Sequence, residues 1–432
     1  MPQIIKNASL LLGKDLTFVN TGFIEIGKNG IIKNVRAGNY NGDDNDCGNI
    51  VDAEGFLIIP GFINAHTHIG DSIGKDVAVD SGFNARIHPV FGVKKRILQK
   101  SKPEHLKTFI RSSAISMMRK GIVAFGDFRE GGPYGIKLLK EAIHNLSIKC
   151  VILGRVEHYI DLAKKVLDDN VVCKGEVGRE GRKKNTVRLP PHILQTVSNV
   201  LQVADGLGIS SANENSDESL KQYKELLQKK NNNKKRQSKK LLMAIHAAES
   251  QNTNDFSRSK TEVVRIMQYL KPDIIVHMTN ATDDDISIVA KKRIGVIVCP
   301  RANGILGVGI PKVAKMLKYG CIVGIGTDNV MLNSPDIFRE MDYLWKVSRA
   351  TEPEFISARE ILKMATVNGA EILGLNSGCI KTGRSADIMF IDKKHLDLYP
   401  IHDPYSSLVH RASQDSIRAI MINGEFIDGV EL

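Results

Sequence analysis

Two histidines separated by a single residue, His66 and His68, end an apolar run that begins at residue 56. Side chains at positions i and i+2 of a strand point to the same side, so both imidazoles can reach one metal ion. The run has the composition of a buried strand, and Pro60-Gly61 lets the backbone bend near its end. Paired histidines on a loop are often only solvated polar residues, so the pair predicts a site only together with partners elsewhere.

Candidate further ligands for such a metal ion lie where later strand-like runs end. His246, His277 and Asp328 each lie at or directly after the end of such a run. In a barrel of parallel strands the reactive groups lie at the C-terminal ends of the strands, so these side chains should meet at one end of the barrel. Imidazoles with a carboxylate and a position left for water form the ligand set of a catalytic zinc-type site. The pattern therefore predicts a metal centre.

Glu249 follows His246 by three residues, in the sequence His-Ala-Ala-Glu. If His246 ends a strand, Glu249 can turn back over the metal and move protons between the attacking water and the leaving group. The structural alternative is a carboxylate at a helix N-terminus, which the helix dipole favours. Because the other histidines and Asp328 already supply four protein ligands, we expect His277 to polarise the attacked atom or hold the water.

The elements that must position these groups alternate between strand and helix patterns from residue 56 onward. Strands are expected at 56–64, 122–127, 150–157, 206–211, 241–246, 273–277, 295–299 and 323–327. Helices are expected at 103–120, 136–144, 160–167, 219–229, 261–270, 283–292, 311–319, 335–350 and 358–373. Eight strands, each followed by a helix, are the count of a (β/α)8 TIM barrel.

The two chain ends lack this alternation. Residues 1–55 and 374–432 contain short strand-like pieces separated by turn residues, and Asn423-Gly424 is a strong hairpin signal. We therefore predict an α/β protein whose barrel takes residues 56–373. Both chain ends are expected to join into one small β-sandwich module beside the barrel.

Composition narrows the class of protein. No apolar stretch of the 432 residues approaches the ~18 that a transmembrane helix needs, and the N-terminus lacks the apolar segment of a signal peptide. The six cysteines are scattered without a Cys-x-x-Cys pair, which is typical of reduced thiols. These features predict a cytoplasmic protein that does not contact membranes.

Two basic tracts, 179–188 and 229–240, account for +11 of the formal net charge of +12. Neither tract contains an aromatic residue or an apolar periodicity, so we interpret both as solvated loops rather than nucleic-acid-binding surfaces. Weak attraction to polyanions would follow from the charge alone. A polyanion-binding protein or a non-catalytic scaffold is the alternative of another class.

The motifs resemble those of the amidohydrolase superfamily, in the branch of cytosine deaminase, S-adenosylhomocysteine/methylthioadenosine deaminase and the triazine chlorohydrolases. The matching segments follow in order along nearly the whole chain: 60–68, 246–249, 299–303, 324–329 and 381–388. The resemblance implies a mononuclear site. Its ligands would be His66, His68, His246 and Asp328, with Glu249 and His277 in proton transfer and Asp328 also acting as a base on the attacking water.

Two departures from the superfamily refine this expectation. Binuclear members bridge their metals with a lysine on the fourth strand, and no lysine occurs here between Lys184 and Lys221. We therefore expect one divalent metal ion, with zinc preferred and Fe(II) as the alternative. Adenosine-type deaminases carry His-Ala-Pro on that strand, whereas this chain has Gly-Ile-Ser-Ser-Ala-Asn at 208–213. An adenosyl substrate is therefore not assumed.

Polar residues at the remaining strand ends are candidates for binding the substrate. The preferred ones are Asp127, Arg155, Glu157, Asn213 and Asn303, with Arg129, His158, Glu214 and the lid residues Arg86 and His88 as further candidates. A mixture of arginine, amide and carboxylate suits a flat heterocycle that carries both donors and acceptors. Each of these residues could equally form a structural ion pair within the loops.

The leading hypothesis is a metal-dependent aminohydrolase that deaminates an amino-substituted heterocycle of the nucleobase, nucleoside or pterin type. Water activated by the metal adds to a ring carbon, Glu249 passes its proton on, and ammonia leaves. The alternative within enzymes is hydrolysis of a cyclic amide, of the imidazolonepropionase kind. The expected partner is a small molecule rather than nucleic acid, and a homo-oligomer remains open.

Overall fold

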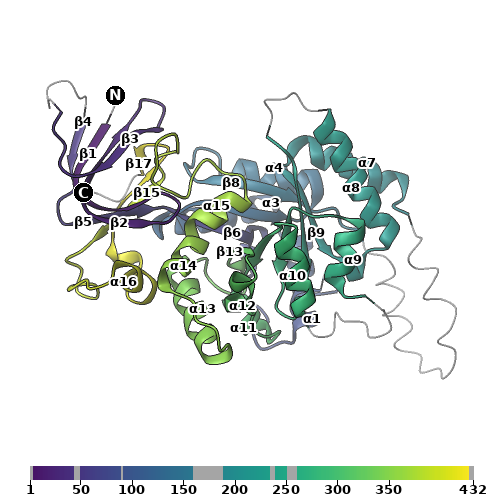
Figure 1. The fold of residues 1–432 in the computed structure, drawn as a ribbon. Helices are drawn as coiled ribbons and strands as arrows, with labels where there is room; N and C mark the ends of the chain where they lie inside the picture. Colours follow the sequence, from purple (N-terminus) through teal and green to yellow (C-terminus); the bar gives the residue numbers. More distant parts are fainter. Residues whose placement is uncertain are drawn as a thin grey trace.

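The computed structural model describes residues 3–42, 49–88, 91–158, 188–233, 239–250 and 260–427. The described residues form a barrel of parallel strands surrounded by helices, and a separate sheet built from the two chain ends (Figure 1). None of the helices in this part of the chain has the length and apolar character needed to span a membrane. The (β/α)8 barrel with a β module, predicted from the sequence, is confirmed.

The barrel strands follow one another in chain order, and every neighbouring pair is parallel. They are β6 (Phe62–His68), β7 (Ile122–Arg129), β8 (Lys149–Gly154), β9 (Gly206–Ser211), β10 (Leu242–Ala247), β11 (Ile274–His277), β12 (Gly295–Val298), β13 (Ile322–Ile325) and β14 (Asp328–Asn329). Because β13 pairs with β12 and β14 pairs with β6, the eighth strand closes the barrel as two short segments.

Gly326 lies at the crossing between these two segments. Its N–H donates to Val298 O at 2.9 Å, and the N–H of the next residue, Thr327, donates to His66 O at 3.0 Å. A Cβ on Gly326 would lie 2.7–2.8 Å from three atoms of His66, so only glycine allows this close approach. The closure therefore brings the residues after Gly326 directly against the strand that carries His66.

The main helices of the described residues are α3 (Pro103–Arg119), α4 (Gly132–Ala142), α7 (Pro191–Val203), α8 (Asp217–Asn232), α9 (Glu262–Tyr269), α10 (Asp283–Lys291), α12 (Val313–Lys318) and α13 (Ile337–Thr351). The shorter ones are η2 (Ile69–Gly74), α1 (Phe83–Ile87), α2 (Val93–Lys100), η3 (Ala212–Glu214), α11 (Pro300–Leu306), α16 (Pro404–His410) and η6 (Gln414–Ser416). Helix α7 is not among the helices expected from the sequence, and the helix expected at 160–167 falls outside the described residues.

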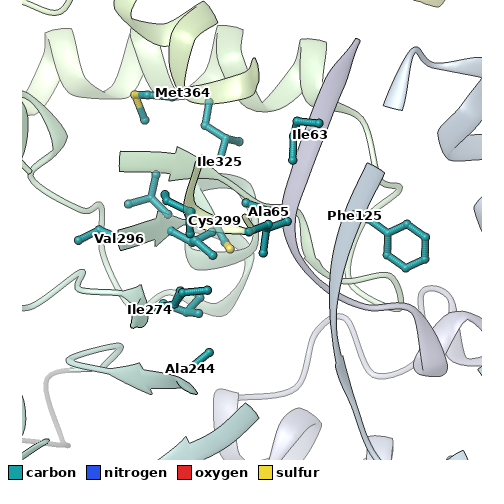
Figure 2. Close-up of a cluster of buried hydrophobic side chains, with 14 of the residues drawn as sticks. Ile63, Ala65, Phe125, Ala244, Ile274, Val296, Cys299, Ile325 and Met364 are labelled. Atoms are coloured by element: carbon teal, nitrogen blue, oxygen red, sulfur yellow. The ribbon is translucent and has the colours of Figure 1, made fainter. Parts of the chain in front are cut away.

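A helical segment covers the outside of the barrel where it closes. It runs through α14 (Ala358–Lys363), the π-helical turn η5 (Met364–Asn368) and α15 (Gly369–Ile372). Figure 2 shows Met364 on this segment near Ile325 of β13, with Ile63 of β6 on the neighbouring strand. The contact is close, because a Cβ on Gly369 would lie 3.0 Å from Ile63 Cβ. Apolar packing thus supports the junction of the first and last strands.

The β module is a sheet in the order β17-β16-β15-β5-β1-β2-β3, with β4 pairing to β1. Its strands are β1 (Gln3–Leu12), β2 (Thr17–Ile26), β3 (Ile32–Ala37), β4 (Asn49–Asp52), β5 (Phe56–Pro60), β15 (Ile388–Asp392), β16 (Ile417–Ile422) and β17 (Glu425–Phe426). The sheet encloses its own apolar core, which includes Ile5, Leu10 and Phe390. Asn423 and Gly424, with φ of 53° and 77°, form the turn of the predicted hairpin.

The single strand expected at 56–64 is wrong. It is two strands: β5 pairs with β1 and β15 in the module, and β6 belongs to the barrel. The break falls at Gly61, whose N–H donates to Asp387 O at 2.9 Å, whereas the N–H of Phe62 donates to Gly121 O at 2.9 Å. Adjacent amides therefore bond to different sheets. The module takes in residues 56–60, which the sequence analysis assigned to the barrel.

Candidate metal centre

Three imidazoles and one carboxylate converge at the C-terminal end of the barrel. His66 Nε2 and His68 Nε2 lie 3.4 and 3.5 Å from Asp328 Oδ1. His246 Nε2 lies 3.2 Å from His66 Nε2, and the three histidines can offer nitrogens that all lie within 4.8 Å of one another. All four residues are buried. Three nitrogens and an oxygen at this spacing fit a zinc-type ion, for which this is a common donor set.

The strand ends turn sharply to aim the functional side chains. Asp328 has φ of 58° and His277 has φ of 78°, which is the left-handed region that residues other than glycine rarely adopt. Ala248, with φ of 51°, reverses the chain between His246 and Glu249. Such strained positions cluster at functional sites. Here they direct Asp328, His277 and Glu249 toward the same end of the barrel.

Glu249 faces His277 across the mouth of the barrel, with 3.6 Å between Oε1 and His277 Nε2. Burial raises the pKa of Glu249 to about 7, although His277 opposes the rise. His277 Nδ1 lies 3.1 Å from Asn303 Oδ1, and Asn303 Nδ2 donates to Thr279 Oγ1 at 2.8 Å. Since the amide of Asn303 presents its oxygen, His277 carries its proton on Nδ1. Its Nε2 is then free to accept a proton from the site.

The protonation states of the four proposed ligands suit a bound cation. Burial lowers the pKa of His66, His68 and His246, so these imidazoles are neutral and keep a lone pair. Burial opposes the ionisation of Asp328, whereas the hydrogen-bonding contact with His66 favours it, and the pKa of Asp328 lies below its ordinary value. The ring of Phe128 packs against His66, with 4.6 Å between centroids, and contributes to this dry environment.

Contacts on the far side of two imidazoles fix their orientation. His246 Nδ1 lies 2.9 Å from the carbonyl oxygen of Ser210, so it donates there and turns Nε2 toward the centre. His68 Nδ1 lies 2.7 Å from Glu130 Oε1. Partners of this kind hold ligating histidines in the tautomer that a metal requires. His277, with His66 and Asp328, forms a second group of close donors, so it borders the same centre.

The residues proposed to bind substrate occupy different environments. Arg155 lies beside Glu130, 3.6 Å from its carboxylate, and Glu157 pairs with Lys95 beyond the end of β8. Asn213 is half-buried in the turn after β9. Asn303 holds His277, as described above. The structure therefore brings Asn303 into the centre and leaves Arg155, Glu157 and Asn213 on the loops around it.

Asp127 is fully buried beside the strand that carries the histidine pair. Its Oδ1 accepts from the N–H of Ile69 at 2.7 Å and from Thr67 Oγ1 at 3.0 Å, so it fixes the turn that follows His68. Burial raises its pKa to about 7. These contacts are those of a structural carboxyl that supports β6.

Sequence reasoning missed two carboxylates that organise the site. Glu130 contacts His68, and Glu262 accepts from the N–H of Ala248 at 2.8 Å and from that of Ala212 at 3.0 Å. Glu262 thereby ties together the loops that follow β9 and β10, including the turn before Glu249. Its position after the helix cap Thr261 is ordinary for a glutamate, so the sequence carried no signal. Glu130 directly follows Arg129 at a strand end, a place that the sequence analysis did search.

Comparisons with known proteins agree with this architecture. A model described as the amidohydrolase family matches residues 57–427. A protein of Methanothermobacter thermautotrophicus with a provisional aminohydrolase name is 32% identical over 426 residues, which cover 98% of each chain. A 5-methylthioadenosine/S-adenosylhomocysteine deaminase of Thermococcus sibiricus is 26% identical over 443 residues, which cover 99% of this chain and 94% of the relative.

Among solved structures, atrazine chlorohydrolase from Arthrobacter aurescens, complexed with zinc, is similar with a TM-score of 0.78. The match covers 99% of this chain and 95% of that one at 18% sequence identity, so it concerns the fold. The family match and the relatives extend the likeness from the fold to the sequence. The chain belongs to the amidohydrolase family and is a hydrolytic enzyme that acts on carbon–nitrogen bonds.

Proposed function

We propose that this amidohydrolase removes an amino group from a heterocycle by hydrolysis, with one divalent metal ion held by His66, His68, His246 and Asp328. The observation that carries the proposal is the half-buried carboxyl of Glu249, which lies 3.6 Å from His277 at the same end of the barrel as that ligand set. An ion held there would supply Lewis acidity, which would make a water in the site acidic enough to act as a nucleophile near neutral pH. Zinc is the preferred ion, as in the similar chlorohydrolase structure.

The residues of the chain divide the proton transfers between them. Asp328, which is ionised, accepts a proton from the attacking water as its oxygen bonds to the ring carbon. Glu249, whose pKa lies near neutrality, gives its proton to the ring nitrogen, takes up the proton of the hydroxyl now on the ring carbon and passes it to the amine. The carbonyl forms as the carbon–nitrogen bond breaks and ammonia leaves, and the proton held by Asp328 returns to Glu249 for the next turnover. His277, oriented by Asn303, presents the lone pair of Nε2 to the hydroxyl on the reacting carbon and accepts its hydrogen bond.

The substrate class follows from the relatives and from the loops. The relative from Thermococcus sibiricus is named for amino-purine nucleosides, which supports an amino-substituted heterocycle here. Arg155, Asn213 and Glu157 lie on loops around the centre and can supply the donors and acceptors that such a ring needs. Glu214, in the same turn as Asn213, has a buried carboxylate oxygen without a partner in the described part of the chain, which adds an acceptor for a ring N–H.

A screen for ammonia release tests the proposal. Protein loaded with zinc, and in parallel with Fe(II), is incubated with amino-purines, amino-pyrimidines, their nucleosides and amino-pterins. Ammonia should appear together with a product in which a carbonyl replaces the amine, and the ring should stay closed. Ring-opened carboxylates without ammonia would contradict deamination and favour a cyclic amide hydrolase. As a control, Glu249→Gln should bind the metal and release ammonia about 10²- to 10⁴-fold more slowly than wild type.

We also propose the cytoplasm as the compartment in which the enzyme acts. Cys150, Cys299, Cys321 and Cys379 are all unpaired in the part of the chain that the structure describes. Free thiols are typical of reducing compartments. Fractionation of the native cells, with detection by an antibody, would test this assignment.

A further inference from the structure

We propose that Glu130 is a positioning residue for the metal centre, which orients His68 and, through Lys94, couples that orientation to the docking of helix α2. The inference rests on the proposed metal site. It goes beyond that site because Glu130 is separate from the four ligands and from the proton-transfer residues.

The contact between Glu130 and His68 sets the tautomer of the imidazole. Glu130 Oε1 lies 2.7 Å from His68 Nδ1, and the two side chains are 10% and 4% exposed. A carboxylate can only accept a hydrogen bond, so Nδ1 must carry the proton. His68 Nε2 then keeps its lone pair, and it faces Asp328 Oδ1 at 3.5 Å. Glu130 thus supplies the support that a metal-ligating histidine needs.

Lys94 compensates the charge of Glu130. Its Nζ lies 2.7 Å from Glu130 Oε1 and 3.3 Å from Asp71 Oδ2, and its side chain is only 8% exposed. Lys94 lies on α2, in the long segment between β6 and β7. A buried carboxylate without a counter-ion would be strongly disfavoured. The nearest cation to Glu130 is therefore supplied by α2, so the docking of that helix supports the contact between Glu130 and His68.

Asp71 extends the same chain of contacts to the opposite ligand. It accepts from Asn329 Nδ2 at 2.7 Å and from the N–H of Met331 at 3.0 Å. Asn329 directly follows Asp328 in β14. The contacts from His68 through Glu130, Lys94 and Asp71 therefore reach both segments that carry ligands at the junction of β6 and β14.

The charges of this cluster balance without a proton on His68. Glu130 and Asp71 are matched by Lys94 and by Arg155, whose Nη1 lies 3.6 Å from Glu130 Oε1. A cluster that served only to stabilise the loop would gain from a charged histidine beside Glu130. Instead, Lys94 Nζ at 2.7 Å and Arg155 Nη1 at 3.6 Å already match the negative charge of Glu130, so no positive charge on His68 is needed. The arrangement suits metal binding better than an ion pair.

The affinity for metal, measured on purified full-length protein, tests this inference. Zn²⁺ dissociation constants are obtained by competition with a chromogenic chelator for wild type, Glu130→Gln and the control Glu141→Gln, whose carboxylate pairs with Lys107 on the surface. Glu130→Gln should weaken binding by about 10- to 100-fold and shift the visible spectrum of the Co²⁺-substituted protein. Glu141→Gln should match wild type in both measurements.

A purely structural role predicts a different pattern. Glu130→Gln would then lower the melting temperature of the metal-free protein and leave the Zn²⁺ dissociation constant and the Co²⁺ spectrum unchanged, which would overturn the inference. If wild type itself bound no Zn²⁺, the proposed function would fail rather than this inference alone.

A second measurement needs no variant of Glu130. Nitrogen NMR of the wild type with labelled histidine, with His68 assigned through His68→Asn, should show Nδ1 protonated in the metal-free protein. A proton on Nε2 instead would contradict the role of Glu130, even if Glu130→Gln did not fold.

Discussion

The backbone angles of Asp328 and His277 show what the site demands of individual residues. Each holds a left-handed conformation that costs roughly 1–3 kcal/mol for a residue with a Cβ. The surrounding barrel can maintain this strain because both residues are buried and hydrogen-bonded or ion-paired. The stability of the fold therefore offsets a local strain that places two functional groups.

Glu249→Gln tests the central assignment at this scale. Glutamine preserves the size of the side chain but cannot exchange a proton, so kcat should fall by about 10²- to 10⁴-fold while bound metal stays at the wild-type level. Steady-state ammonia release and elemental analysis of the same preparation give the two quantities. A near-normal kcat would remove Glu249 from the proposed mechanism.

The proposed ligands and proton-transfer residues could be predicted from the sequence, but the two carboxylates that hold their loops and side chains in place could not. His66, His68, His246, His277, Glu249 and Asp328 were all found, because strand ends and short motifs mark them. Glu130 and Glu262 act through contacts with residues far along the chain, 62 positions for Glu130 and His68. No local pattern encodes such a contact, because it depends on how the finished barrel places its loops.

At the scale of elements, the link between α8 and β10 corrects our interpretation of the basic tract 229–240. Its first residues belong to α8, so the tract is only partly a loop among the described residues. Asn231 Oδ1 accepts from the N–H of Leu241 at 2.8 Å, and its Nδ2 donates to Leu241 O at 3.1 Å. This pair of bonds holds the end of the helix against the start of the strand that carries His246.

Asn231→Ala should therefore destabilise the protein by about 1–3 kcal/mol, since both backbone groups of Leu241 lose their partner. Urea unfolding followed by circular dichroism measures the loss. Asn233, which is exposed two residues further along, gives a matched control, and the stability of Asn233→Ala should stay near that of wild type. Equal urea midpoints for Asn231→Ala and Asn233→Ala would show that the two hydrogen bonds between Asn231 and Leu241 do not stabilise the fold.

The contact between α11 and α13 predicts a dependence of stability on pH. Glu340 is fully buried and accepts from the N–H of Arg301 at 3.2 Å. Burial raises its pKa to about 8, although Arg301 opposes the rise. The folded state therefore keeps a proton that the unfolded state loses near pH 4.5, and the contribution of Glu340 to stability declines as the pH rises from about 4.5 to about 8.

Glu340→Gln cannot lose that proton, so its stability relative to wild type should improve steadily across this pH range. Melting temperatures of both proteins at pH 5 and pH 8.5 give the comparison. Glu425→Gln, at an exposed strand position, should run parallel to wild type. A constant difference between Glu340→Gln and wild type would contradict a protonated Glu340.

The elements themselves were mostly predictable, because buried parallel strands and amphipathic helices leave clear periodicities. The fourth strand, 206–211, was placed at its observed bounds. The boundary between β5 and β6 could not be predicted, because both strands are apolar and follow each other directly in the sequence. Only the hydrogen bonds of Gly61 and Phe62 separate them, and these depend on partners more than fifty residues away.

For the whole molecule, the proposed ligand set joins the first and last strands of the barrel, so metal should stabilise the fold. Zinc at 100 times its dissociation constant adds about 2.7 kcal/mol, which corresponds to a rise of about 3 °C in Tm for a chain of this length. Differential scanning fluorimetry with and without zinc measures the rise. His246→Ala should abolish it and His144→Ala, at an exposed position, should not. A rise retained in His246→Ala would disprove the ligand assignment.

The split of the eighth strand into β13 and β14 also determines when the proposed ligands become available during translation. On the ribosome, His66 and His68 emerge early, whereas Asp328 is made only after seven barrel strands have been synthesised. A nascent chain therefore presents only part of the proposed ligand set for most of its translation. On the proposed assignment, the four ligands meet only when β14 pairs with β6 and the barrel closes.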